Sequence, residues 1–386
     1  MKDPKQIYCA QPFYNMHIEG EHKWPCCLMY EYEHAHQGSV ESAWQGAKFT
    51  EIRNAFREGW KHSACNTCWH QESVDGAKSQ RLSYTAKQHD LGNPITYDAD
   101  TLRTISWSFG NTCNFACRTC SLTYSTGWLN ETKRMAEQGD AQARKRLDEH
   151  SKKQFDNVQW EQIEPMLGDV VYLDMIGGET LINPKLPGIM EQMIERGYAR
   201  NINLMLTTNG STGPTDTWIK RLREFKSLRL NFSIDAVTED TFKYVRTGNW
   251  NEVSQNIDDW KAQDWVGEIR CNPSFSILNI WDCDRILAWL DKKFGFLNVG
   301  YNWVEFPKHY NAVNLPEPAK QDIQDKSRYW HSKKILSQLW SSKSYDTYWQ
   351  EFIKRTAWLD QSRGESVEKL MPGLATIIHK YSKGTT

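Results

Sequence analysis

The alternation of hydrophobic and polar positions over residues 103–306 predicts short strands separated by helices. Runs rich in apolar and β-branched residues predict the strands, and apolar residues at helical spacing predict the segments between them. The predicted strands are residues 102–109, 170–176, 202–208, 229–235, 268–277 and 297–305. The predicted helices include residues 186–196, 215–225, 250–262 and 284–293. Alternating strands and helices indicate an α/β fold of parallel βα units, either an open sheet or a partial (βα)6 barrel.

The N-terminal segment has a different pattern. A short strand is predicted at residues 15–18. After it, four apolar residues recur at helical spacing and predict a helix with one buried face. These residues are Phe49, Ile52, Phe56 and Trp60. Residues 90–100 contain Gly, Asn and Pro, the residues typical of a linker, so we place a domain boundary near residue 95.

The pattern changes again after residue 306, where helical periodicity continues without strands. Residues 131–156 interrupt the central part with dense mixed charge, which is typical of a solvated helical insertion. The alternative interpretation is a lid or a substrate-recognition arm. The predicted division is a cysteine-rich module at residues 1–95, an α/β core at 96–310 and a helical region at 311–386.

Composition narrows the class of protein. The chain has 386 residues, 25% of them charged, and a formal net charge of -1. This balance gives no electrostatic reason to expect a nucleic-acid or anionic-membrane partner. Because the first residues lack an apolar signal region and no long apolar run follows, we expect a soluble cytoplasmic protein without a membrane span. In a reducing compartment, the 10 cysteines indicate metal or redox chemistry.

Three cysteines lie together directly after the first strand of the α/β core. Residues 111–120 read NTCNFACRTC and contain Cys113, Cys117 and Cys120. One strand or helix would scatter them over several faces, whereas a loop can bring them to one soft metal centre. Three ligands on a four-iron cluster would leave one iron open for chemistry, as in catalytic metal sites. A zinc site or chance clustering is the alternative.

This CxxxCxxC loop after a first strand resembles the radical S-adenosylmethionine superfamily, over roughly residues 100–306. The resemblance implies a [4Fe–4S] cluster on the three cysteines, with S-adenosylmethionine bound to the fourth iron. Reductive cleavage of this cofactor then yields a 5′-deoxyadenosyl radical that abstracts hydrogen from the substrate. The resemblance also implies a flavodoxin- or ferredoxin-like electron donor. Thr119 stands where the family commonly has an aromatic residue against the adenine.

Polar motifs follow the later strands in the order that this family shows, and the resemblance assigns them to S-adenosylmethionine. The Gly-Gly-Glu segment at residues 177–179 resembles the motif that binds the methionyl amine. The polar ends of the next strands resemble segments that contact the ribose and the carboxylate. Taken singly, each motif can also be an ordinary structural turn. The candidate cofactor contacts are Gly177, Gly178, Glu179, Asn209, Ser233, Asp235, Arg246, Phe115 and Thr119.

The N-terminal cysteines form a second candidate centre. Their order resembles the twitch and SPASM modules that carry auxiliary clusters, although in the family this module follows the barrel. The resemblance implies one auxiliary [4Fe–4S] cluster. The candidate ligands are Cys9, Cys26, Cys65 and Cys68, with Cys27 as the alternate for Cys26. Structural zinc is the rival, because four thiolates also suit tetrahedral zinc.

The expected function is that of a radical S-adenosylmethionine enzyme of the oxidoreductase or maturase type. By resemblance to the auxiliary-cluster modules, its substrate is a peptide or protein side chain, with a small metabolite as the alternative. A non-catalytic iron–sulfur or zinc-binding electron-transfer protein is the other class that the cysteines allow.

Overall fold

A computed structural model describes residues 7–29, 34–73, 79–98, 101–152 and 160–382. The chain divides into two compact units, each assembled from separate segments of sequence. Unit 1 comprises Met1–Thr112, Asp148–Leu206 and Asp216–Leu228. Unit 2 comprises Cys113–Leu147, Thr207–Thr215 and Arg229–Thr386. Each unit is described separately.

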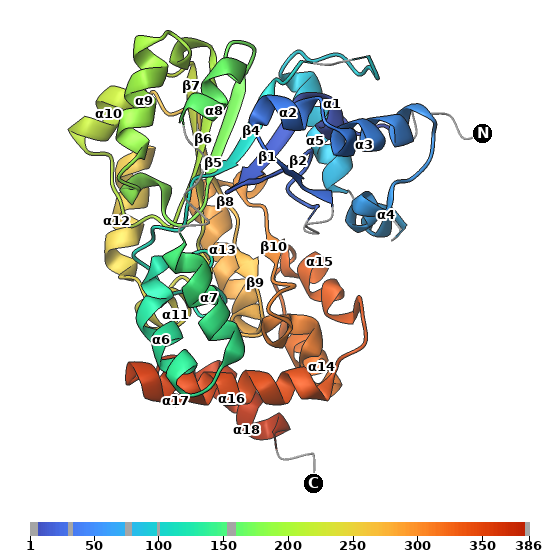
Figure 1. Cartoon of the computed structure of the whole chain (residues 1–386). Coiled ribbons are helices and arrows are strands. Elements are labelled where there is room, and N and C mark those ends of the chain that lie inside the picture. Colours follow the sequence, from blue (N-terminus) through green and yellow to red (C-terminus); the bar gives the residue numbers. More distant parts are fainter. Residues whose placement is uncertain (1–6, 30–33, 74–78, 99–100, 153–159, 383–386) are drawn as a thin grey trace. The chain divides into compact units, whose positions relative to one another are not determined.

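The sheet of unit 1 is mostly parallel (Figure 1). Within this unit its strands are hydrogen-bonded in the order β3-β2-β1-β4-β5-β6. Strands β1, β2 and β3 pair antiparallel, whereas β1 with β4, β4 with β5, and β5 with β6 pair in parallel. The strands are β1 (Asn15–Glu19), β2 (His22–Trp24), β3 (His36–Gln37), β4 (Thr104–Ser108), β5 (Tyr172–Ile176) and β6 (Asn203–Thr208), the last ending in unit 2.

Side chains alternate between the two faces of this sheet. Ile105 and Trp107 of β4 and Leu173 of β5 are fully buried on one face, while Ser106 and Asp174 on the other face are half-buried. A side chain of this size contributes about 1.5–3 kcal/mol when it is fully buried. The helices of unit 1 after β4 are α8 (Trp160–Ile163), α9 (Leu186–Glu195) and α10 (Asp216–Leu222). The predicted strands 102–109, 170–176 and 202–208 are therefore confirmed as β4, β5 and β6.

The N-terminal part of unit 1 packs its helices around an apolar cluster that includes Phe13, Trp24, Ile52, Phe56 and Trp69. The predicted strand at 15–18 is confirmed as β1, and its parallel pairing with β4 joins this part to the sheet. The helices are α1 (Gln11–Tyr14), α2 (Val40–Trp44), α3 (Ala47–Arg57), α4 (Asn66–Ser73) and α5 (Gln80–Asp90).

One predicted core residue of this part is wrong. Phe49, Ile52 and Phe56 are buried on α3 as expected, but Trp60 is 44% exposed. The helix ends at Arg57, and Gly59 has a φ of 79°. This left-handed conformation turns the chain away from the helix axis, so Trp60 leaves the apolar face.

Unit 2 contains two short parallel strand pairs. Strand β7 (Ser227–Phe232), which begins in unit 1, pairs with β8 (Glu268–Cys271), and β9 (Ser274–Phe275) pairs with β10 (Asn302–Trp303). The single strand predicted at residues 268–277 is therefore wrong. Between its two pieces lies Pro273, which has no N–H for a continuous ladder. The last predicted strand, 297–305, forms paired strand over only two residues.

Helices make up most of unit 2. Its central helices are α11 (Glu239–Arg246), α12 (Trp250–Lys261) and α13 (Cys283–Phe294). The predicted C-terminal helices are confirmed and are visible at the red end of the chain in Figure 1. They are α14 (Glu317–Lys326), α15 (Ser332–Ser337), α16 (Asp346–Arg363), α17 (Val367–Leu370) and α18 (Pro372–Tyr381).

The polar stretch at residues 131–156 is helical where the structure describes it. It contains most of α6 (Leu129–Glu137) and all of α7 (Ala141–Ser151), whereas residues 153–156 lie outside the described residues. Trp128 directly precedes α6, and Met135 lies within it. Both side chains belong to a buried cluster that also contains Leu359 of α16. In unit 2 this stretch is therefore packed on one face rather than solvated all round.

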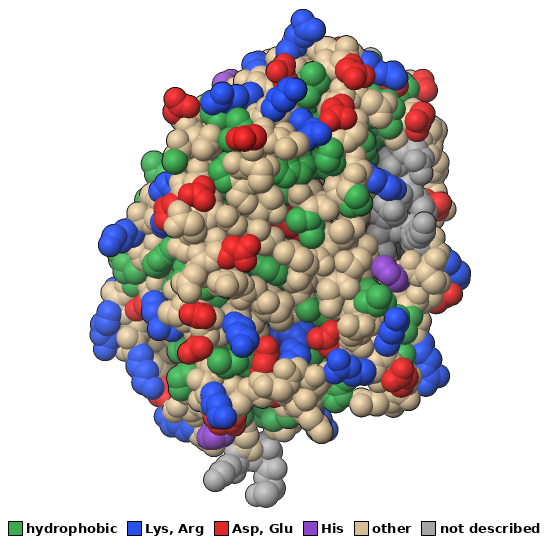
Figure 2. Space-filling view, turned by 90° about the vertical axis from the view of Figure 1, so that its left-hand side faces the viewer, with side chains coloured by type: hydrophobic (Ala, Val, Ile, Leu, Met, Phe, Trp, Pro, Cys, Tyr) green, Lys and Arg blue, Asp and Glu red, His purple; other side chains and the backbone are tan. Residues whose placement is uncertain are grey.

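Two surface properties bear on partners. Basic and acidic side chains are interspersed on the face shown in Figure 2. Within the part of the chain that the structure describes, no helix combines the length and apolar character needed to cross a membrane.

Candidate metal and cofactor sites

The loop that carries Cys113, Cys117 and Cys120 belongs to unit 2, and local hydrogen bonds hold its first part. The Thr126 hydroxyl accepts from the backbone N–H of Cys113 and donates to its carbonyl, both at 3.0 Å. The Ser125 hydroxyl donates to the carbonyl of Phe115 at 2.5 Å. These bonds fix the chain direction before the second cysteine.

The second part of the loop is held by the end of α11. The backbone N–H of Ala116 donates to the Thr247 hydroxyl at 2.8 Å. Thr247 caps α11 with a φ of 63°, a left-handed conformation that β-branched residues rarely adopt. A Cβ on Gly248 would lie 2.3 Å from the Phe115 ring. Thr247 and Gly248 directly follow Arg246, a predicted cofactor contact. The contacts of these two residues therefore support the cysteine loop.

The three thiols are half-buried and reduced. Burial raises the pKa of Cys117 to about 11, against the opposing effect of the nearby Arg246 guanidinium. Burial likewise raises the pKa of Cys120 to about 12. The Cys113 sulfur accepts from the Asn209 side-chain amide at 3.9 Å. Bound iron would deprotonate such thiols, because a coordinating thiol loses its proton.

Within residues 7–29, 34–73, 79–98, 101–152 and 160–382, no three His, Cys, Asp or Glu side chains converge closely enough for one metal ion. An iron–sulfur cluster offers several irons, so its ligands do not need to reach a common ion. Three thiols of one short loop, with its backbone fixed, fit such a cluster. The donor set is also the one that iron–sulfur clusters use.

The remaining cofactor candidates in unit 2 form a buried ion pair beside this loop. Arg246 Nη1 lies 2.5 Å from Asp235 Oδ2, and the carbonyl of Arg246 lies 3.6 Å from the Cys117 sulfur. Asp235 Oδ1 accepts from the backbone N–H of Ser274 at 2.7 Å. Asp235 and Arg246 therefore bind each other, and Arg246 Nε is buried with no hydrogen-bond partner among the residues that the structure describes. Ser233 is half-buried at the end of β7.

Two candidates within the loop have different surroundings. Phe115 is buried and packs edge-on against Phe242 of α11, with ring centroids 6.1 Å apart. Its side chain therefore belongs to the core of unit 2. Thr119 is half-buried. Asn114, which the sequence analysis did not select, accepts from the Asn209 side-chain amide at 3.0 Å and links the loop to residues after β6.

The Gly-Gly-Glu segment belongs to unit 1, where it packs on the chain that continues from β4. A Cβ on Gly177 would lie 2.7 Å from the carbonyl oxygen of Gly110, and one on Gly178 would lie 2.3 Å from that of Thr112. Glu179 is fully buried, and its carboxylate accepts from the backbone N–H of Leu181 at 3.2 Å. The two glycines are thus required by backbone contact within unit 1.

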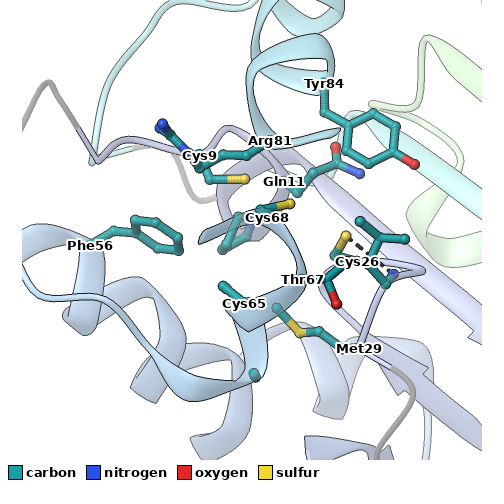
Figure 3. Close-up of a pocket in the computed structure, with 13 residues that line it drawn as sticks. Cys9, Gln11, Cys26, Met29, Phe56, Cys65, Thr67, Cys68, Arg81 and Tyr84 are labelled. Carbon is teal, nitrogen blue, oxygen red and sulfur yellow. Dashed lines mark hydrogen bonds between the residues drawn. The ribbon is translucent and has the colours of Figure 1, made fainter. Parts of the chain in front are cut away.

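The predicted N-terminal cysteines converge on one pocket of unit 1. Figure 3 shows Cys9, Cys26, Cys65 and Cys68 around this pocket. Its volume is about 390 Å³, including the space at its mouth that is open to solvent. Four thiols from three segments of the sequence meet at this pocket, and four thiolates are the donor set of iron–sulfur clusters and of tetrahedral zinc. Among the described residues they do not converge closely enough for one metal ion. Gln11, Thr67, Arg81 and Tyr84 also line it.

Burial affects the acidity of the thiols of this pocket. Burial raises the pKa of Cys9 to about 12 and raises the pKa of Cys65 and Cys68 as well. Arg81 from α5 lies at the pocket and pairs with Glu72, with its Nε 2.8 Å from a carboxylate oxygen. The bridging of α4 and α5 by this ion pair supports the segment that carries Cys65 and Cys68.

Cys26 and Cys27 have different surroundings. Cys26 lines the pocket and accepts from the backbone N–H of Leu28 at 3.5 Å, whereas the Cys27 sulfur lies 3.1 Å from the Tyr84 hydroxyl. Hydrogen bonding from the Cys26 side chain lowers the pKa of the Cys27 thiol. Of the two alternatives left by the sequence, Cys26 is the one that faces the pocket.

Several residues that support the cysteine loop could not be selected from the sequence. Trp128 donates from its indole N–H to the carbonyl of Cys117 at 2.9 Å, and Arg363 donates to the carbonyl of Ala116 at 2.8 Å. The one signal available was Arg118, a charged residue between two cysteines of a motif. A buried charge at such a position requires partners elsewhere in the chain.

Residues 107–269 match the sequence model of the Radical SAM superfamily. No curated protein matches the chain. Among solved structures, anSMEcpe with bound AdoMet is 14% identical at a TM-score of 0.37, and the match covers 62% of this chain and 66% of that one.

Two further structures show similar levels of likeness. Streptococcus suis SuiB bound to precursor peptide SuiA is 11% identical at a TM-score of 0.36, over 75% of this chain and 58% of that one. TYW1 with a lysine-pyruvate adduct is 14% identical at a TM-score of 0.24, over 42% and 52%. This chain thus spans less than two thirds of each of the three. The family match is confined to residues 107–269, which are similar in sequence to the Radical SAM superfamily.

Proposed function

We propose that the chain is a radical S-adenosylmethionine enzyme with its [4Fe–4S] cluster on Cys113, Cys117 and Cys120. The observation that carries the proposal is a hydrogen-bonded loop with three half-buried thiols inside the matched domain. When bound, the cluster and S-adenosylmethionine supply an electron and a 5′-deoxyadenosyl radical for hydrogen abstraction. An electron donor of the flavodoxin or ferredoxin kind completes the system.

The residues of the chain bind and orient in this proposal. Three cysteine ligands leave one iron open for the methionyl group of the cofactor. The carboxylate of Glu179 is proposed to bind the amine of this methionyl group. Asn209, Ser233, Asp235 and Arg246 are proposed to contact the rest of the cofactor, together with Gly177, Gly178, Phe115 and Thr119. The proposed architecture is a partial (βα)6 barrel at residues 96–310, with a module at 1–95 before it and a helical region at 311–386 after it.

The test is the formation of 5′-deoxyadenosine by the anaerobically reconstituted, reduced chain with S-adenosylmethionine. We expect at least one equivalent of 5′-deoxyadenosine per chain. If the cluster is fully loaded, the cofactor binds and no product forms, the alternative of a non-catalytic iron–sulfur electron-transfer protein is correct.

We also propose that Cys9, Cys26, Cys65 and Cys68 bind an auxiliary [4Fe–4S] cluster in a twitch- or SPASM-like module. The convergence of these four thiols on one pocket supports this assignment. Such a centre would accept an electron from a substrate radical or anchor the substrate, proposed to be a peptide or protein side chain, with a small metabolite as the alternative. About eight irons per chain would support two clusters, whereas about four irons with one zinc would establish structural zinc instead.

A further inference from the structure

A charged side chain lies inside the cysteine loop of unit 2. Arg118, between Cys117 and Cys120, has a side chain that is 0% exposed. Its backbone N–H donates to the carbonyl of Val245 and its Nε to the carbonyl of Tyr244, both at 2.9 Å. Its guanidinium lies 3.6 Å from the centroid of the Tyr244 ring. These contacts fix Arg118 against the last turns of α11.

The outer edge of the same guanidinium binds two carboxylates from the C-terminal part of unit 2. Arg118 Nη2 lies 2.5 Å from Asp360 Oδ1 and 2.6 Å from Glu365 Oε2. The Tyr244 hydroxyl donates to the same Asp360 oxygen at 2.9 Å. The other Asp360 oxygen accepts from the backbone N–H of Val367 at 2.8 Å. Arg118 is thus anchored to the end of α16 and the start of α17.

The C-terminal segment and Trp128, just before α6, hold the peptide groups on either side of Cys117. Arg363, the last residue of α16, donates to the carbonyl of Ala116 at 2.8 Å and pairs with Glu131 at 3.1 Å. The Trp128 indole donates to the carbonyl of Cys117 at 2.9 Å. The peptide planes before and after the middle cysteine are therefore both fixed, and with them the direction of its Cα–Cβ bond.

We propose that Arg118 is a positioning residue for the iron–sulfur cluster and that the end of α16 with α17 is its support. This inference rests on the proposed function, since it requires a cluster on the three cysteines. Residues that hydrogen-bond behind metal ligands set the orientation of those ligands and tune the metal. A planar guanidinium binds two carboxylates and stacks on Tyr244 at the same time, which a lysine ammonium cannot reproduce. The C-terminal helices thus support the geometry of Cys117 through Arg118 and Ala116.

The experiment uses the full-length, anaerobically reconstituted chain and compares Arg118→Lys and Glu365→Gln with a matched control, Arg134→Lys. Arg134 also binds the C-terminal segment, at the carbonyl of Ser362, but it is exposed and does not contact the cysteine loop. The readouts are the electron paramagnetic resonance spectrum with and without S-adenosylmethionine, the midpoint potential, and the rate of iron loss to a chelator. The change of spectrum on cofactor addition reports on the cluster with an open iron only.

For Arg118→Lys we expect about tenfold faster iron loss, together with a changed spectrum and a shifted potential. For Glu365→Gln we expect changes in the same direction but smaller, because Asp360 still binds the guanidinium. Arg134→Lys should match wild type. The thermal unfolding of the iron-free variants separates an effect on the cluster from an effect on the fold.

If both test variants had the same spectrum, midpoint potential and rate of iron loss as the wild-type chain, the inference would be overturned. If Arg118→Lys is not recovered folded, Glu365→Gln decides alone, since its shape is unchanged and only its charge is lost. A wild-type chain whose spectrum does not respond to S-adenosylmethionine would overturn the proposed function itself. The two failures are therefore distinguishable.

Discussion

The cysteine loop of unit 2 and the cysteine pocket of unit 1 gather thiols in different ways. In the loop, Cys113, Cys117 and Cys120 lie within one short segment, held by hydrogen bonds to its own backbone. In the pocket, the four thiols come from distant segments and meet because helices pack on an apolar cluster. The loop gathers its thiols within one segment, although distant residues such as Thr247 support its backbone, whereas the pocket gathers its thiols only through tertiary packing. Spacing within one segment identifies the candidate ligands of the loop. In the pocket, the order of the cysteines along the chain identified the same four that line it but left Cys26 and Cys27 as alternatives.

The largest expected difference between the two regions concerns catalysis. Cys117→Ala removes one ligand of the cluster that binds S-adenosylmethionine, so formation of 5′-deoxyadenosine should fall below detection with a loss of about four irons. Cys65→Ala combined with Cys68→Ala should also remove about four irons but leave cofactor cleavage in place. Product analysis and iron assay measure both results. Cys271→Ala, at a buried cysteine of β8, is the control. Undiminished product from Cys117→Ala would contradict the assignment.

The difference also explains what could be predicted from the sequence. Alternation along the chain predicts β4, β5 and β6 because each alternates between two faces of one sheet. The spacing of Cys113, Cys117 and Cys120 predicts a loop site because three ligands in one segment need no tertiary information. The assigned cofactor contacts remain predictions.

What the sequence could not predict depends on distant contacts. Arg118 pairs with Asp360, 242 positions along the chain, and no periodicity connects them. Whether Cys26 or Cys27 faces the pocket depends on how α5 packs, since Tyr84 on that helix contacts Cys27. The prediction of a single strand over residues 268–277 did not take Pro273 into account, although a proline has no N–H for a continuous ladder.

Packing under the loop gives the next largest effect. Gly248→Ala adds a methyl group 2.3 Å from the Phe115 ring, and we expect a loss of about 3 kcal/mol in the free energy of unfolding. Gly188→Ala on α9 meets no atom within 4 Å and should be neutral or slightly stabilising. Denaturant unfolding of the iron-free chains measures both. Equal stability of the two variants would show that the loop is not tightly packed.

A buried carboxyl group of the unit 1 sheet makes stability depend on pH. Burial raises the pKa of Asp174 on β5 to about 6. Because this value is above that of the unfolded chain, about 4, the folded chain binds the proton more tightly and loses stability as pH rises from about 4 to 6. Asp174→Asn should remove this loss, so the variant gains on the order of 2 kcal/mol relative to wild type between pH 4 and pH 7. If the difference in free energy of unfolding between the two chains were the same at pH 4 and at pH 7, the prediction would be contradicted.

The smallest expected effect distinguishes adjacent residues of the pocket. Cys26→Ala should lower the iron content of the N-terminal centre, because this sulfur lines the pocket, whereas Cys27→Ala should leave it unchanged. The loss of the contact between Cys27 and Tyr84 should affect only the surroundings of α5. Iron assay of the two variants, in a background where Cys117→Ala has emptied the loop, isolates this centre. Equal iron loss in both variants would mean that the vicinal pair exchanges ligands. In that case the packing of α5 against Cys27 would not select the ligand, and the contrast between a local loop and a packed pocket would fail for this residue.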